Sequence, residues 1–182
     1  MPRSGSIHGR FQVFHNNHLK YALKSFESVD FMYVGLTAYD ILFTNNRNHR
    51  FNLLDNPLAF YERVEMVTKV LVGAGLGIDS FTVVPFPIER PWLLSQYIPS
   101  ECKCYTSIKD QWNNTKIDIL RKQGYDVGIV DINADRIDGF NVRRLIRERD
   151  KSWRLLVPCE TQKMVDEIHL AERMLQIEND ID

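Results

Sequence analysis

Short apolar segments alternate along this chain with longer segments whose apolar residues recur at helical spacing. Strands are expected at 5–11, 30–36, 81–88, 102–108 and 125–132. The second of these is apolar along its length, as expected when both faces of a sheet are covered. The alternation predicts an α/β fold, a Rossmann-like, doubly wound parallel sheet of about five strands with C-terminal helices.

The segments between the strands carry the helical pattern. Helices are expected at 15–26, from 56 to the glycine at 73, at 109–123, at 139–149 and at 160–175, with a short helix or turn at 90–99. Asn56-Pro57 is read as a helix start, because proline in the first turn loses no hydrogen bond. Gly124 is a typical stop signal.

Composition predicts one domain over residues 1–182, with a C-terminal helical element at about 160–178. The 23 basic and 24 acidic residues nearly cancel, so no nucleic-acid or membrane partner is expected. No apolar run approaches the roughly 20 residues that span a bilayer. Three cysteines do not make a disulfide framework, and no metal-ligand spacing accompanies them. A cytoplasmic protein is therefore expected.

The stretch GRFQVFHNNHL, residues 9–19, stands where the first strand gives way to a helix. Free N–H groups and the dipole at the start of a helix favour an anion, and Arg10, His15 and His18 would add donors. The GxGxxG and Walker motifs are absent, so side chains would hold any phosphate. A capping or surface pair of histidines is the alternative interpretation.

A second basic segment begins a helix further along the chain. In RIDGFNVRRLIRER, Arg143 and Arg147 share one helix face by their spacing. The junction of loop and helix again suits an anion, although a basic helix is more often a solvated face. An anion site and a solvated face therefore both stay open.

Five segments together resemble a known family. They are GRFQVFHNNH (family GRFQPFHxGH), NPLAFYERVEMVTKVL (NPFTxxERxxMI), RIDGFNVRRLI (SGTxVRR), KSWRLLVP (GDWRxLLP) and VDEIHLAERM (IDEIxxxER). In this order, from about residue 7 to 175, the chain resembles the archaeal-type nicotinamide mononucleotide adenylyltransferases of the HxGH nucleotidyltransferase superfamily.

The resemblance implies transfer of a nucleotidyl group from an NTP to nicotinamide mononucleotide, which gives NAD and pyrophosphate. AMP is the favoured nucleotidyl group. The resemblance also implies catalytic roles for His15, His18, Arg10 and Arg143. It implies nucleotide binding by Gly9, Phe11, Gln12, Asp138, Gly139, Phe140 and Asn141. It implies acceptor binding by Trp92, Arg47, Arg50, Asn56 and Arg63. Mg²⁺ would arrive with the NTP, and no protein metal ligand is expected.

Three of the larger side chains have a competing interpretation. Trp92 could stack on the acceptor or pack in the core, whereas a packing role is expected for Trp153. Arg63 could face the site or pair with Glu62 or another neighbour. Relatives of this kind often assemble, and the basic helix at 139–149 and the C-terminal helix could build an interface between copies of the chain.

Several residues depart from the family pattern. Val13 replaces a proline, and Asp55 replaces an arginine before the NP motif. Asn17 replaces the glycine between the histidines, where its side chain is expected to intrude on the nucleotide. Asp138 and Phe140 replace two hydroxyl residues, although Asp138 is a good helix N-cap. Two alternatives follow: cytidylyl or adenylyl transfer to a different phosphorylated acceptor, or a nucleotide-binding pseudoenzyme.

Overall fold

The computed structural model describes residues 3–40, 53–107, 111–132 and 135–181. It divides into two compact units that alternate along the chain. Unit 1 comprises Met1–Arg10, Lys20–Tyr39 and Leu76–Ala134, and unit 2 comprises Phe11–Leu19, Asp40–Gly75 and Asp135–Asp182. The single domain expected from the sequence stays a prediction.

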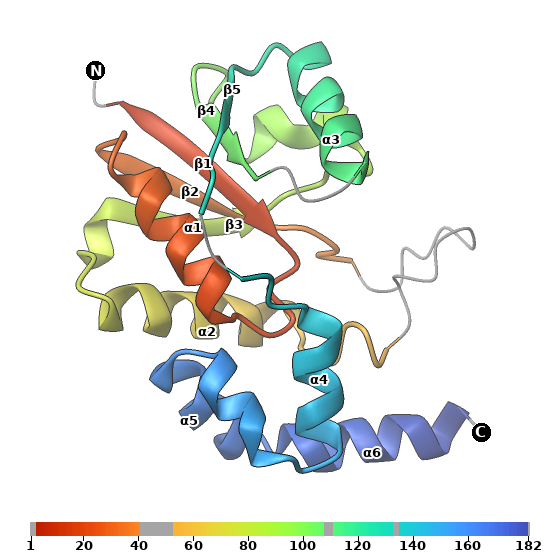
Figure 1. Ribbon diagram of the computed structural model, residues 1–182. Helices are drawn as coiled ribbons and strands as arrows, with labels where there is room; N and C mark the ends of the chain where they lie inside the picture. Colours follow the sequence, from red (N-terminus) through yellow and green to blue (C-terminus); the bar gives the residue numbers. More distant parts are fainter. Residues whose placement is uncertain (1–2, 41–52, 108–110, 133–134, 182) are drawn as a thin grey trace. The chain divides into compact units, whose positions relative to one another are not determined.

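Unit 1 contains a five-stranded parallel sheet (Figure 1). Its strands are β1 (Ser4–Gly9), β2 (Phe31–Leu36), β3 (Phe81–Pro85), β4 (Lys103–Thr106) and β5 (Val127–Ile129). The order β3-β2-β1-β4-β5 reverses direction between β1 and β4, which makes this the topological switch point of the sheet. The predicted α/β Rossmann-like fold is confirmed, with every strand shorter than the apolar run that indicated it.

The β1–β4 register fixes which side chains share a face of this sheet. Ser6 pairs with Cys104, and the Ser6 hydroxyl donates to the Cys104 sulfur over 3.2 Å. Cys104 belongs to a buried cluster with Phe86 and with Leu120 of α3 (Gln111–Lys122). The face that carries Ser6 and Cys104 is therefore the one covered by α3.

Three further helical elements contribute to unit 1. The C-terminal part of α1 (Asn16–Phe26) belongs to this unit, and there the Tyr21 hydroxyl donates to the backbone carbonyl of Tyr105. The short 3₁₀ helices η2 (Ile78–Ser80) and η3 (Pro91–Gln96) flank β3 in sequence. The short helix or turn predicted at 90–99 is thus confirmed as η3.

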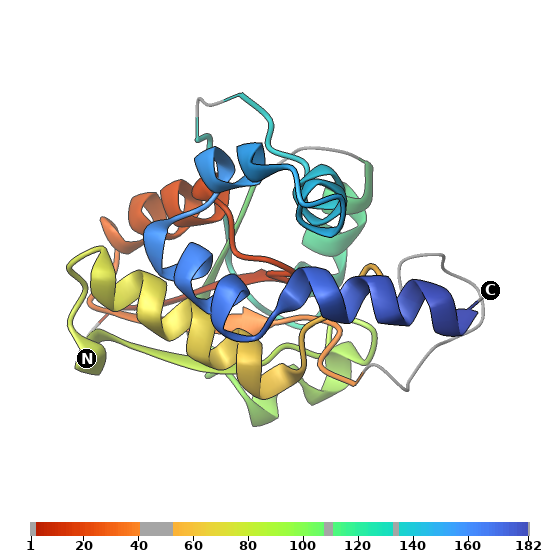
Figure 2. The ribbon, with the colours of Figure 1, turned by 90° about the horizontal axis from the view of Figure 1, so that it is seen from below.

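Unit 2 is built mainly of helices. They are α2 (Phe60–Gly73), α4 (Gly139–Arg147), η4 (Lys151–Leu156), α5 (Cys159–Glu167) and α6 (Leu170–Ile181). In this unit α2 packs against α5, and α4 packs against η4 and α6 (Figure 2). In the part of the chain that the structure describes, no helix has the length and apolar character needed to cross a membrane.

The start of α2 differs from the prediction. The helix begins at Phe60 rather than at Asn56-Pro57, because the Glu62 carboxylate accepts the backbone N–H of Ala59 over 2.8 Å and caps it there. Arg173 of α6 grips the same carboxylate with two bonds of 2.7 and 2.8 Å. Burial would raise the pKa of Glu62, but Arg173 and the Ala59 N–H outweigh it and lower that pKa.

The segment predicted as one helix at 160–175 is two helices. The chain leaves α5 at Ile168 and takes a left-handed conformation at His169, whose φ is 49°. The N–H of His169 then donates to the Asp166 carbonyl over 3.1 Å, in the manner of a helix C-terminus. The apolar spacing continues through the break, so periodicity alone could not reveal it.

Candidate functional site

The two predicted histidines form the N-terminal cap of α1. His15 is the residue before the helix, and its Nδ1 accepts the backbone N–H of His18 over 3.4 Å. In return, Nδ1 of His18 accepts the backbone N–H of His15 over 3.2 Å. This reciprocal arrangement is a capping box built from imidazoles, and it needs a separation of three residues. The capping interpretation left open by the sequence is confirmed.

The capping box also fixes where the histidine protons lie. A nitrogen that accepts a hydrogen bond carries no proton, so a proton on either ring lies on Nε2. The rings are stacked with centroids 3.4 Å apart and planes 17° apart. Both Nε2–H groups are consequently oriented donors at the positively polarised end of α1.

The loop before the histidines holds the rings in place. Phe11 and Phe14 pack on His18 with ring centroids 4.9 and 5.4 Å away. The side-chain amide of Gln12 exchanges two bonds of 2.9 Å with the backbone of Leu58. Val13, at the position of the family's proline, is buried, and its peptide bond to Gln12 is cis. Phe11 and Gln12 thus have packing roles here, and their nucleotide contacts stay predictions.

Asn17 has a structural contact in unit 2. Its side chain is buried and donates to the backbone carbonyl of Asp135 over 2.7 Å. The bond ties the first turn of α1 to the segment that leads into α4, within unit 2. Glycine could not make this structural bond, and the predicted intrusion on the nucleotide stays a prediction.

Asp138 caps α4 as predicted, accepting the N–H of Phe140 over 3.1 Å. Phe140 itself is 62% exposed. The Asn141 side chain accepts from Arg144 over 2.7 Å. Gly139 lies close to Arg143, since a Cβ there would approach its Nη1 to 3.4 Å. Capping accounts for Asp138, and a phosphate contact by these residues stays a prediction.

Arg143 is buried and held by two partners. Its Nη1 donates to the Gln12 carbonyl over 2.5 Å, and its Nη2 donates to Asp55 over 2.7 Å. Its Nε has no hydrogen-bond partner among the described residues. The solvated-face interpretation is therefore wrong for Arg143. In the sequence, Asp55 stands out only as a departure from the family pattern. Its role as the countercharge of Arg143 is visible only in the folded chain.

Unit 1 holds the other predicted contacts that the structure describes. Gly9 ends β1, and its carbonyl accepts the N–H of Thr37 over 3.0 Å. Arg10 follows it and is half-buried. Trp92 of η3 is 66% exposed, so the core-packing alternative for it is wrong. Its ring is accessible for stacking.

The remaining predicted acceptor residues divide between buried and undescribed positions. Asn56 and Arg63 are buried in unit 2, and the Arg63 guanidinium lies 5.8 Å from the centre of the Phe60 ring. Arg47 and Arg50 lie outside the described residues. The acceptor roles of all four stay predictions.

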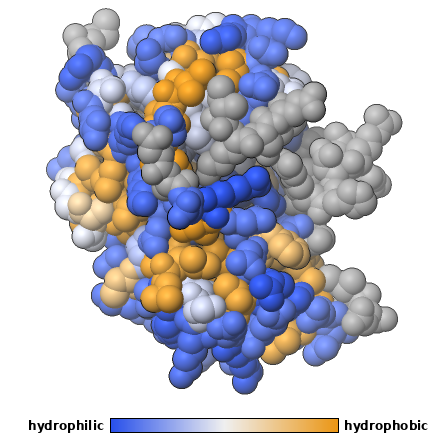
Figure 3. All heavy atoms as spheres, in the orientation of Figure 1, coloured by the Kyte–Doolittle hydropathy of each residue, from blue (hydrophilic) through white to orange (hydrophobic). Residues whose placement is uncertain are grey.

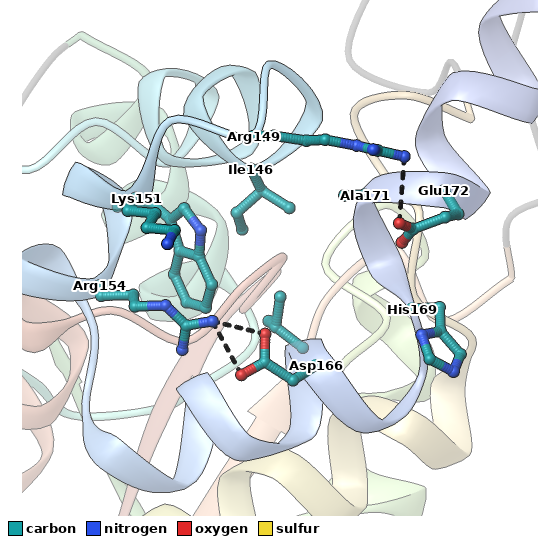
Figure 4. A pocket seen from close by; sticks show the side chains of 10 residues that line it. Ile146, Arg149, Lys151, Arg154, Asp166, His169, Ala171 and Glu172 are labelled. Atoms are coloured by element: carbon teal, nitrogen blue, oxygen red, sulfur yellow. Dashed lines mark hydrogen bonds and ion pairs between the residues drawn. The ribbon is translucent and has the colours of Figure 1, made fainter.

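A cavity in unit 2 lies apart from the predicted set of residues (Figure 4). Its volume is about 360 Å³, and Trp153, buried as predicted, lines it together with Ile146 and Val165. The cations at its rim are paired, Arg149 with Glu172 at 3.2 Å and Arg154 with Asp166 at 2.7 Å. None of the residues predicted to bind nucleotide lines this cavity.

Metal-ligand clusters single out no other site among the residues that the structure describes. Within the described ranges, no group of three or more His, Cys, Asp and Glu side chains could hold a metal ion. Figure 3 shows hydrophilic and hydrophobic residues interspersed over the visible face. The imidazole pair therefore remains the arrangement with the clearest chemistry for a phosphate.

Comparison with known proteins identifies nucleotidyltransferases as relatives of the chain. The chain is 33% identical over 175 residues to a phosphonoformate cytidylyltransferase from Streptomyces viridochromogenes, a match covering 94% of this chain and 95% of that protein. It is 27% identical over 184 residues to a nicotinamide-nucleotide adenylyltransferase from Thermococcus onnurineus, covering 100% and 92%. No protein-family model matches the chain.

Solved structures show the same fold. A bifunctional NMN adenylyltransferase/ADP ribose pyrophosphatase from Francisella tularensis superposes with a TM-score of 0.64 at 18% identity. The match covers 93% of this chain and 54% of that one, so the chain spans about half of that protein. Another structure of it contains AMP and a manganese ion. The chain belongs to the family of nucleotidyltransferases that includes phosphonoformate cytidylyltransferase and the archaeal nicotinamide-nucleotide adenylyltransferases, and it is an enzyme of this kind.

Proposed function

We propose that this enzyme transfers the nucleotidyl group of a magnesium-bound NTP to an ionised phosphate or phosphonate acceptor, with His15 and His18 at the transferred phosphorus. The observation that carries the proposal is the imidazole capping box, which presents two oriented Nε2–H donors. N–H donors at a helix N-terminus suit phosphate oxygens well.

The chemistry asks little of the protein beyond placement and charge stabilisation. An oxygen of the acceptor attacks the α-phosphorus of the NTP, the bond from that phosphorus to the bridging oxygen breaks, and pyrophosphate leaves with the electron pair. An acceptor already ionised at neutral pH needs no general base. Donors fixed before the reaction stabilise the charge that develops on the phosphoryl oxygens.

Magnesium fits this scheme as part of the nucleotide substrate. Bound to the triphosphate, the ion neutralises phosphate charge. The relative that contains manganese and AMP supports a divalent ion. Arg10 and Arg143 would add positive charge.

Two donor–acceptor pairs deserve direct comparison. ATP with nicotinamide mononucleotide is the pair predicted from the sequence, and the archaeal relatives support it. CTP with phosphonoformate is the second candidate, because the identity of 33% to the cytidylyltransferase exceeds the 24–29% to the adenylyltransferases. Both pairs share the same attack of a phosphorus oxyanion on an α-phosphorus.

The test is a two-by-two assay of ATP or CTP with either acceptor, in Mg²⁺, with products identified by mass spectrometry. We expect one pair to give a nucleotidylated acceptor and an equal amount of pyrophosphate. Nucleotide binding without product from any pair would favour the pseudoenzyme alternative. A cytoplasmic location, the absence of nucleic-acid partners and assembly of like chains stay predictions.

A further inference from the structure

His8 of β1 carries a buried imidazole whose two ring nitrogens lack hydrogen-bond partners among the described residues. The residue is 4% exposed, and neither Nδ1 nor Nε2 has a partner among the described residues. Its ring stacks on Phe86 with centroids 4.4 Å apart and planes 5° apart. Gly35, the partner of His8 on β2, makes this possible, since a Cβ there would lie 2.4 Å from the Phe86 ring. The imidazole is therefore fixed by packing, but neither ring nitrogen is hydrogen-bonded to a described residue.

Buried polar atoms without partners are uncommon and costly. Ser6, two residues earlier on the same strand face, is satisfied by Cys104. A chain that needed only to fill space beside Phe86 could use an apolar ring. The ring nitrogens of His8 therefore indicate a ligand that supplies their hydrogen-bond partner.

The place of His8 in the sheet fits a ligand site. It lies near the carboxyl end of β1, beside β4, where the strand order reverses and where open α/β sheets bind their ligands. The register that pairs Ser6 with Cys104 brings the buried Thr106 level with His8 on the same face. Both residues belong to unit 1.

The charge around His8 indicates which ligand it would take. Burial and the positive charge of Lys116 on α3 lower the pKa of His8 well below 6.5, so the ring is neutral at pH 7. A neutral imidazole keeps one N–H donor, and the Lys116 ammonium supplies positive potential. An anionic oxygen is stabilised by both groups, whereas a cation is repelled by Lys116.

We infer that His8 binds an anionic oxygen of the acceptor at the switch point between β1 and β4, with Lys116 supplying charge. The inference rests on the proposed function, because it assigns a residue to the acceptor of that reaction. The ligand class is a phosphate or phosphonate oxyanion, and the predicted acceptor residues did not include His8.

The kinetic test uses His8→Phe, which keeps a ring against Phe86 and removes both nitrogens. We expect the KM for the acceptor to rise about tenfold or more, as for loss of a hydrogen bond to a charged group. The KM for the NTP and kcat should stay within about threefold. Ser6→Ala, on the same strand face, is the matched control and should leave all three constants near wild type. His8→Gln, which retains a donor, should recover part of the acceptor KM.

A direct titration separates this inference from the proposed function. In ¹⁵N-histidine NMR of the full chain, the signals absent from His8→Phe belong to His8, and phosphonoformate, nicotinamide mononucleotide and inorganic phosphate are added in turn. Saturable shifts of those signals with any of the three support binding at His8, even if no pair turns over. Turnover with an unchanged acceptor KM in His8→Phe, or His8 signals that ignore all three anions, overturns the inference and leaves nucleotidyl transfer standing.

Discussion

The histidines of the two units are used in opposite ways. In unit 2, Nδ1 of His15 and of His18 each accept a backbone N–H, so the fold itself orients both rings. In unit 1, His8 is oriented only by stacking, and both of its nitrogens lack partners among the described residues. The difference indicates two kinds of site, one with donors set before substrate arrives and one completed by a ligand.

The charged groups near the histidines follow the same division. Arg143 of unit 2 already has Asp55 as countercharge. Lys116 of unit 1 acts on a neutral imidazole and depresses its pKa. A nucleotide that binds Arg143 must therefore compete with a carboxylate.

The largest expected effect separates capping from catalysis at His15. Asparagine is a good helix cap, so His15→Asn should preserve the start of α1 but remove the Nε2–H donor. We expect kcat to fall about a hundredfold, with the melting temperature nearly unchanged. His169→Asn, at an exposed histidine of unit 2, is the control and should retain full activity. A His15→Asn enzyme with wild-type kcat would reduce the imidazole pair to a cap.

The next effect concerns the Asp55–Arg143 pair. Asp55→Asn keeps an acceptor for the guanidinium but removes the negative charge, so we expect the KM for the NTP to fall several-fold, on the order of 1 kcal/mol for a partly screened charge. Asp55→Ala leaves a buried guanidinium short of a partner and should lower the free energy of unfolding by about 2 kcal/mol. Steady-state kinetics and urea unfolding measure the two effects. A higher KM in Asp55→Asn would show that the carboxylate assists the nucleotide.

His8 should leave a signature in the pH dependence of stability. Because the folded-state pKa is below 6.5, the unfolded chain binds more protons than the folded chain as pH falls through 6.5. The resulting loss of stability is at most about 1.4 kcal/mol per pH unit for one proton, and it is absent above that range. Urea unfolding at several pH values between 5 and 8 should show a shallower acid slope for His8→Phe than for wild type. Parallel slopes would contradict the neutral, buried His8.

The smallest expected effect is at Asn17. Asn17→Ala removes the 2.7 Å bond to the Asp135 carbonyl and should cost about 1 kcal/mol of unfolding free energy. If the side chain is structural, as the bond indicates, the KM for the NTP should hardly change. A marked drop in that KM would instead support the intrusion predicted from the sequence.

The sequence predicted the sheet better than the ends of the helices. Strand positions follow from apolar runs, which depend on burial over a few neighbouring residues. The start of α2 depends on Glu62, whose carboxylate is held by Arg173 more than a hundred residues away. The break between α5 and α6 depends on a left-handed backbone conformation at His169. Histidine is not a residue type that predicts this conformation.

For the candidate site as well, the sequence predicted the local contacts but not the contacts between distant segments. The spacing of His15 and His18 indicated both a cap and a phosphate contact, and local geometry confirms the cap. The partners of Asn17 and Arg143 come from distant segments, so no local pattern could identify them. His8 was read as one residue of a strand, because a missing hydrogen bond is visible only in the folded chain.

One measurement tests the central claim most directly: pyrophosphate release by His18→Gln, with the donor–acceptor pair that wild type turns over. Glutamine at this position preserves a capping box and removes the imidazole. The account predicts a folded enzyme whose kcat is about a hundredfold lower. Wild-type kcat in that variant would mean that the His15–His18 pair serves the helix alone, and that another group stabilises the transferred phosphorus.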